Sequence, residues 1–116
     1  MPPQQAPLFG EVWHADLDPA VGHEQAGQRP VIIVSIEGFN QNRSRLVFVV
    51  PVTSRERRNP LHVQINPSRD GLRQRSFALC EMARSISIDR LRFRIGVIDQ
   101  RAMNEIGDRL KVILGL

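Results

Sequence analysis

Residues 29–36 read RPVIIVSI, and the part from Val31 onward is apolar except for Ser35. β-Branched side chains dominate this run, which is typical of a strand that is buried on both faces. A second apolar run, LVFVVPV at residues 46–52, has the same character. The two runs predict the central strands of a sheet with a buried core.

Shorter segments on either side predict further strands, because they alternate between apolar and polar residues or are bounded by turn residues. The expected strands are 10–17, 61–65, 76–80 and 92–98, and a short helical turn is expected within 37–43. The turns between them are marked by Asp18-Pro19, by RERRNP at 55–60 and by NPSRDG at 66–71.

The periodicity changes after Asp99, which is a suitable helix N-cap. Apolar residues then follow at helical spacing, at Met103, Ile106, Leu110, Ile113 and Leu114. This spacing predicts a helix that covers the core. No linker or repeat divides the chain, so we expect a single domain at residues 9–116 after a loose tail at residues 1–8. We expect this domain to be mainly β, a small curled β-barrel with a C-terminal α-helix.

The charge is basic, with a net charge of +4, and Lys111 is the only lysine among 16 basic residues. Genomic base composition can produce such an arginine bias, but a planar guanidinium also binds phosphate through two hydrogen bonds. Six arginines gather between residues 54 and 76 and predict a basic rim: Arg55, Arg57, Arg58, Arg69, Arg73 and Arg75. Nucleic acid is therefore the favoured class of partner. The low aromatic content of 5% argues against an aromatic base-stacking platform.

Several other classes are excluded. No apolar run is long enough to span a bilayer, no secretory signal is present, and the lone Cys80 is expected to be a small buried hydrophobe, so we expect a cytoplasmic protein without membrane contact. Phosphate-binding and dinucleotide-binding glycine motifs are missing. His14, His23 and His62 are too scattered for a metal triad, and His14 and His62 fit polar positions of strands. We expect neither a metal nor a cofactor.

The loop at residues 22–30, GHEQAGQRP, carries an unusual density of polar groups beside the apolar run. Pro30 favours an extended backbone at Arg29, so the Arg29 side chain should leave the strand entrance in a defined direction. Thr53 and Ser54 follow the second apolar run. Two interpretations remain open: solvated loop residues that cap strands, or a phosphate site at the rim of the barrel.

Several segments together resemble the MazF/PemK family of toxins. These are GEVWHADLDPAVGHEQAGQRPVIIVS at 10–35, Phe39-Asn40, VVPVTS at 49–54, CEMARSISIDRL at 80–91 and Ile95-Gly96-Val97 before the predicted helix. The resemblance covers nearly the whole chain. It implies an SH3-like barrel of the CcdB/MazF type, a homodimer, and metal-independent cleavage of single-stranded RNA. It also implies inhibition by a MazE-like antitoxin with a disordered tail.

The resemblance implies roles for individual residues. Arg29 would stabilise the phosphorane, Thr53 would hold a non-bridging oxygen, and Glu24 would accept the 2′-OH proton or orient Arg29. The attack of the 2′-OH would leave a 2′,3′-cyclic phosphate and a 5′-OH end, without a protein nucleophile. Further residues are expected to bind RNA: His23, Gln25, Gln28, Ser54, Arg55, Ser76, Glu81 and Arg84.

One departure from the family leaves the general base and acid open among Glu24, His23 and Glu81. Many relatives read Cys-Asp-Gln where this chain has Cys80-Glu81-Met82, and PemK-type members have an arginine where this chain has Leu79. A PemK-style aspartate–arginine pair is thus not intact. Two rival functions are a CcdB-like gyrase poison and an RNA-binding barrel without activity.

Overall fold

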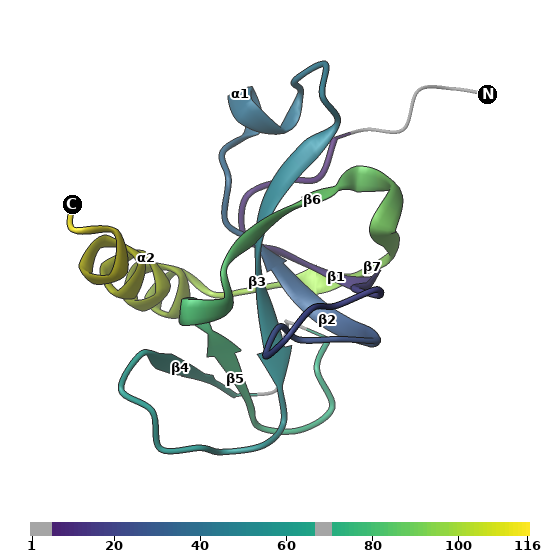
Figure 1. Ribbon diagram of the computed structural model, residues 1–116. Coiled ribbons are helices and arrows are strands. Elements are labelled where there is room, and N and C mark those ends of the chain that lie inside the picture. Colours follow the sequence, from purple (N-terminus) through teal and green to yellow (C-terminus); the bar gives the residue numbers. More distant parts are fainter. Residues whose placement is uncertain (1–5, 67–70) are drawn as a thin grey trace.

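The computed structural model describes residues 6–66 and 71–116. Its strands and helices are shown in Figure 1. In chain order they are β1 (Glu11–Asp16), β2 (Gln28–Ile33), α1 (Glu37–Asn40), β3 (Leu46–Thr53), β4 (His62–Ile65), β5 (Ser76–Leu79), a 3₁₀ turn (Cys80–Met82), β6 (Arg84–Ser87), a second 3₁₀ turn (Ile88–Arg90), β7 (Leu91–Val97) and α2 (Gln100–Leu114).

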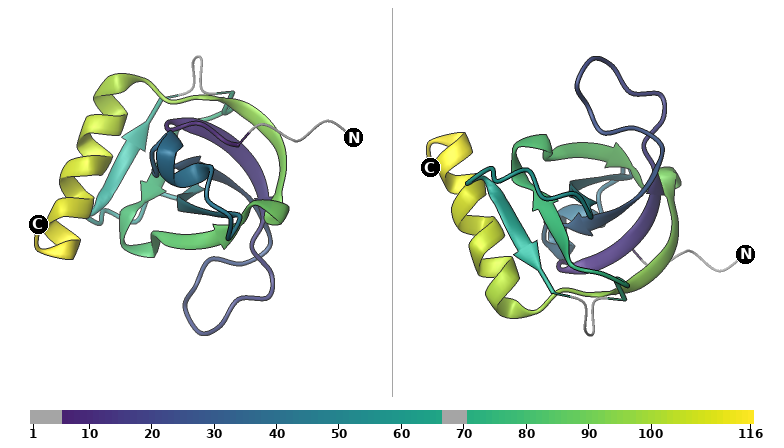
Figure 2. Two further views of the ribbon diagram at one scale, coloured as in Figure 1. Left: turned by 90° about the horizontal axis from the view of Figure 1, so that it is seen from above. Right: turned by 90° about the horizontal axis from the view of Figure 1, so that it is seen from below.

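The strands form one antiparallel sheet in the order β4-β5-β3-β2-β1-β7, and β6 also pairs with β3. The sheet curls strongly around its core, as the two views of Figure 2 show. Within the described part of the chain no pairing joins β4 to β7, so the curled sheet stays open. The predicted mainly β architecture with a C-terminal helix is confirmed, with an open edge where a closed barrel would have none.

Strands β2 and β3 separate two clusters of buried residues. Ile32 and Val50 face one cluster, whereas their neighbours Val31, Ile33 and Val49 face the other. Successive side chains of a strand point to opposite faces, so both faces of these strands are buried. The expectation drawn from the apolar runs is therefore confirmed.

Helix α2 covers the first of these clusters and lies along β4 (Figure 2). The Asp99 carboxylate accepts a hydrogen bond from the Ala102 amide at 2.8 Å, which confirms Asp99 as the N-cap. Met103 and Ile106 are buried against the sheet. Leu114, in the last turn, is exposed, so the apolar stripe of the helix extends beyond the core that it covers.

The structure corrects two expectations about the strands. Strand β2 spans Gln28–Ile33, not 31–36. It ends early because the Ser35 hydroxyl donates to the Asn40 side chain and turns the chain into α1. Strand β6 was not predicted, since a four-residue edge segment with one buried side chain, Ile86, carries little pattern.

The expected tail at residues 1–8 lies mostly outside the described residues. Of its described part, Pro7 is buried and its carbonyl accepts a hydrogen bond from Asn40 at 2.7 Å. Among the described residues, no helix is long and apolar enough to cross a membrane.

Candidate active site

The connection between β1 and β2 extends from the body of the molecule (Figure 2) and is tied at its base. The Leu17 amide donates to the Gly27 carbonyl at 2.9 Å, and the Gly27 amide donates to Asp18 Oδ1 at 2.9 Å. Gly27 has a φ of 78°, which favours glycine because it has no side chain. This closure fixes where β2 begins and therefore where Arg29 lies.

Arg29 is the second residue of β2, so its expected place in a loop is wrong. Its backbone pairs with that of Ala15 in β1. The sheet therefore fixes the position and direction from which the Arg29 side chain leaves the backbone. The Arg29 Nε donates to the Ala26 carbonyl at 2.8 Å. This contact anchors the guanidinium by Nε, and within residues 6–66 and 71–116 no hydrogen bond or ion pair holds its two Nη groups, so they can bind a ligand.

Thr53 ends β3 and is buried, with 6% of its surface exposed. Its Oγ1 accepts a hydrogen bond from the Arg55 amide at 3.2 Å. A hydroxyl that accepts in this way keeps its own hydrogen for donation. Thr53 is therefore both a strand cap and a positioned donor, so the two interpretations of this residue are compatible.

Arg29 and Thr53 line one cavity of about 260 Å³, here called the Arg29 cavity. Other residues of its wall include Gln28, Ser54, Arg73 and Ser76. Its wall includes two arginines and several hydroxyl residues and, among the described residues, no acidic one, a combination that suits a phosphate group. The sequence had placed Arg73 in the basic rim without assigning it to the site.

Glu24 and Gln25 line a second cavity of about 200 Å³, here called the Gln25 cavity, together with Pro51, Glu81 and Arg84. Glu24 Oε1 accepts a hydrogen bond from the Val21 amide at 2.7 Å. Its Oε2 lies 3.7 Å from Nη1 of Arg84. The described contacts of Glu24 are thus with Val21 and Arg84, and the structure does not bring Glu24 to Arg29.

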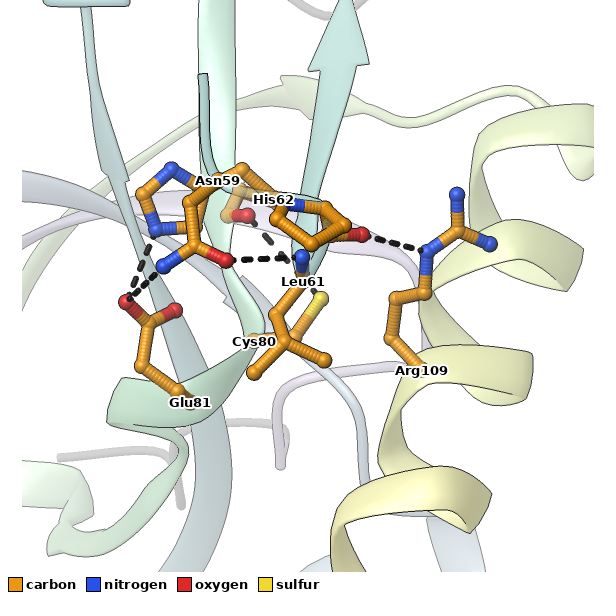
Figure 3. A network of polar contacts seen from close by, with 8 residues as sticks. Asn59, Leu61, His62, Cys80, Glu81 and Arg109 are labelled. Carbon is orange, nitrogen blue, oxygen red and sulfur yellow. Dashed lines mark hydrogen bonds and ion pairs between the residues drawn. The ribbon is translucent and has the colours of Figure 1, made fainter. Parts of the chain in front are cut away.

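Glu81 belongs to a polar network that the sequence did not reveal (Figure 3). Its Oε2 lies 2.8 Å from His62 Nε2 and 3.4 Å from Asn59 Nδ2. The His62 side chain is only 4% exposed. Strand pairing explains the contact, because His62 lies opposite Leu79, two residues before Glu81. The alternating pattern of the sequence predicts that His62 is a polar residue of a strand. Its contact with Glu81 follows only from the pairing of β4 with β5.

The remaining predicted RNA-binding residues lie outside both cavities. His23 and Arg55 are exposed and belong to the wall of neither cavity. In the expected basic rim, Arg57 and Arg58 are also exposed, Arg75 pairs with Glu56 at 2.9 Å, and Arg69 lies outside the described residues.

Cys80 is fully buried, as expected from the sequence. Burial raises the pKa of its thiol to about 12, so the thiol is neutral at neutral pH. Within residues 6–66 and 71–116, no three or more His, Cys, Asp or Glu side chains gather as a possible metal site.

Comparison with known proteins agrees with this architecture along most of the chain. Residues 9–114 match the model of a family described as the PemK-like, MazF-like toxin of type II toxin–antitoxin systems. The chain is 37% identical over 112 residues to endoribonuclease MazF9 of Mycobacterium tuberculosis, covering 92% of this chain and 95% of the relative.

Two solved structures are similar over nearly their full length. The MazF crystal structure (Form-I) from Deinococcus radiodurans superposes with a TM-score of 0.86 at 26% identity, covering 97% of this chain and 100% of that one. An endoribonuclease in complex with its cognate antitoxin, from a mycobacterial species, gives a TM-score of 0.79 at 30% identity, covering 96% and 97%. With this fold and with a family match over residues 9–114, the chain belongs to the PemK-like, MazF-like toxins of type II toxin–antitoxin systems.

Proposed function

We propose that this protein is an endoribonuclease toxin that cleaves single-stranded RNA without a metal ion, in the cytoplasm. The observation that supports this most is the Arg29 cavity, which brings a guanidinium and a threonine hydroxyl together. The names of two relatives also support the proposal, since proteins that are 37% and 32% identical to this chain are called endoribonucleases. In the proposed reaction, the ribose 2′-OH attacks the adjacent phosphorus and the 5′-oxygen leaves. The products are a 2′,3′-cyclic phosphate and a 5′-OH end.

Arg29 is assigned to charge stabilisation. As the 2′-oxygen approaches phosphorus, negative charge grows on the non-bridging oxygens, and two parallel N–H groups can bind it. The Arg29 Nε contact with Ala26 holds the guanidinium in place before RNA binds. A donor that is already oriented costs little reorganisation during the reaction.

Thr53 is assigned to the second hydrogen bond on the phosphate. Its hydroxyl accepts from the Arg55 amide and so has its hydrogen available for a non-bridging oxygen. Gln28, Ser54 and Ser76 line the same cavity and are proposed to contact the RNA backbone there.

Proton transfer from the 2′-OH is assigned to Glu24, with His23 and Glu81 as the other candidates. The three are held differently. His62 and Asn59 hold Oε2 of Glu81, whereas the Val21 amide holds Oε1 of Glu24, and Oε2 of Glu24 lies 3.7 Å from Arg84. His23 is exposed near the tip of the loop between β1 and β2. A general base must come within about 2.6–3.2 Å of the proton that it accepts. Glu24 is preferred because it belongs to the connection between β1 and β2 that leads directly into Arg29.

The protein is further proposed to form a homodimer and to bind a MazE-like antitoxin. One of the solved relatives is itself in complex with its cognate antitoxin. In this chain, an apolar cavity of about 420 Å³ is lined by Ile36, Phe39, Phe48, Ile113 and Leu114, which are all exposed. Exposed apolar patches of this kind mark surfaces that contact other proteins.

The proposed function is tested by incubating a purified protein with a long unstructured RNA in EDTA. We expect discrete fragments with the wild type and with Arg43→Ala, because Arg43 is exposed and lies outside both cavities. Arg29→Ala should remain folded by circular dichroism and should lose activity by about 10²- to 10³-fold. RNA that is bound but never cut would instead favour the inactive RNA-binding barrel.

A further inference from the structure

The Gln25 cavity has a different chemical character from the Arg29 cavity. It holds two carboxylates, Glu24 and Glu81, against one guanidinium, Arg84. Such a charge balance disfavours a phosphate group and favours a neutral group that donates hydrogen bonds. The two cavities are neighbours, because Pro51 lines one while the next residues of β3, Val52 and Thr53, line the other.

Two buried polar atoms at this cavity lack a hydrogen-bond partner among the described residues. They are Oε1 of Gln25 and Nη1 of Arg84. Gln25 is only 9% exposed, so the fold also shields its unpaired side-chain oxygen from water. Buried polar groups are nearly always paired in the state in which a protein functions. Nη1 of Arg84 keeps only the ion pair with Glu24 at 3.7 Å, which is longer than a hydrogen bond. The acceptor on Gln25 and the donor on Arg84 therefore point to a ligand that supplies both complements.

Glu81 adds a second acceptor to the same wall. His62 and Asn59 both contact Oε2 of Glu81, as Figure 3 shows. Within the described residues, Oε1 of Glu81 takes no hydrogen bond, so this oxygen is available to the cavity that the residue lines. His62 thus acts as a positioning residue, because its nearly buried ring fixes the orientation of the carboxylate.

The cavity therefore offers one donor, from Arg84, and acceptors from Gln25 and from the carboxylates of Glu24 and Glu81. The Watson–Crick edge of guanine offers the complement: the O6 acceptor, and the N1–H and N2–H donors. Uracil presents one donor between two acceptors, and adenine and cytosine each present a single donor group. Arginine is also the residue that most often binds guanine O6. In single-stranded RNA, this edge is free to enter a pocket.

We propose that the Gln25 cavity is a base-selecting subsite that takes a guanine of the bound RNA strand, next to the phosphate held in the Arg29 cavity. Along β3, Pro51 and Thr53 face the same side about 7 Å apart, so one strand of RNA could reach both cavities. This inference rests on the proposed function, because it assumes that RNA is the substrate.

The inference is tested by binding, so that it does not depend on cleavage. A random oligonucleotide pool with 2′-fluoro substitution cannot undergo 2′-OH attack, and the bound fraction is sequenced. We expect the wild type to enrich guanine at one fixed position. Gln25→Leu and Arg84→Met should each lower this preference by roughly 10-fold or more, the discrimination that one good base contact supplies. Gln64→Leu is the matched control, since Gln64 is exposed and lies outside both cavities.

Replacing the selected guanine by inosine, which lacks the 2-amino group, should weaken binding to the wild type, because one acceptor of the cavity then has no donor. Enrichment of another base, no enrichment, or a guanine preference that persists in both folded variants would overturn the inference. Cleavage without guanine selection would leave the proposed function standing. Guanine selection by a protein that never cuts RNA would support the subsite and contradict the proposed function.

Discussion

Arg29 of β2 and Thr53 of β3 each stand two residues beyond the Val31–Pro51 pair, the last pair that the two strands share, and both line the Arg29 cavity. Val31 pairs with Pro51, and each step back along one antiparallel strand is a step forward along the other. Because side chains alternate, a shift of two residues returns to the same face of the sheet. The geometry of the Arg29 cavity is therefore set by the pairing of the two core strands.

This relationship predicts the effect of removing the Thr53 hydroxyl. Thr53→Val keeps the shape of the side chain but removes both the proposed contact with phosphate and the acceptor for the Arg55 amide. We expect cleavage to slow by about 10²-fold or more, and the free energy of unfolding to fall by about 1 kcal/mol. Rates on a fluorogenic oligonucleotide and thermal unfolding measure the two effects.

Thr53→Ser is the matched control, because it keeps the hydroxyl and removes only a methyl group. It should retain most of the activity that Thr53→Val loses. A Thr53→Val protein with the wild-type rate would show that the hydroxyl only caps the strand.

Replacing the two loop candidates tests the assignment of the proton acceptor. A general base contributes about 10²- to 10⁴-fold, so Glu24→Gln should lower kcat by at least about 10²-fold. His23→Ala should retain most of the wild-type kcat, as single-turnover rates on the same oligonucleotide would show. The reverse pattern would assign the role to His23.

The buried thiol of Cys80 gives a prediction that is independent of function. With a pKa of about 12, only roughly one thiol in ten thousand is ionised at pH 8. We expect iodoacetamide to leave the native protein unlabelled and to label it rapidly in guanidinium chloride, as followed by mass spectrometry. Because the pKa is raised in the folded state, this group contributes stability that is fully present below its unfolded pKa and declines above it. Fast labelling of the native protein would contradict its burial.

The N-cap of α2 gives a prediction about stability. Asp99→Ala removes the acceptor for the Ala102 amide and should cost about 1 kcal/mol, seen as a Tm lower by several degrees. Asp108→Ala is the control, since Asp108 lies exposed within the same helix. An equal loss in both variants would mean that the cap is not the cause.

Some of the fold follows directly from the sequence. The spacing of Met103 and Ile106 gave the helix and its buried face, and the two apolar runs gave β2 and β3 as strands buried on both sides. These signals are strong because a single period persists over many residues. Strand β6 could not be predicted, because its four residues are held in place by pairing with β3, and a local sequence pattern does not encode this pairing.

The site was predicted in part, for a related reason. Arg29 and Thr53 line one cavity because the pairing of β2 with β3 brings the ends of these strands together, and register follows from the hydrophobic pattern. The separation of Glu24 from Arg29 depends on Arg84, which comes from β6, and on the loop closure at Gly27. The His62–Glu81 contact similarly depends on β4 meeting β5. Contacts between distant segments are not carried by any one stretch of sequence.

Mapping the ends of cleaved RNA tests the central claim most directly. A long RNA is treated in EDTA with the wild type or with Arg29→Ala, and new 5′ ends are ligated and sequenced with and without prior phosphorylation by a kinase. We predict discrete wild-type ends that are ligated only after kinase treatment, because they carry 5′-OH groups, and that are absent with Arg29→Ala. Ends that already carry a 5′-phosphate, or the same ends with Arg29→Ala, would contradict the mechanism.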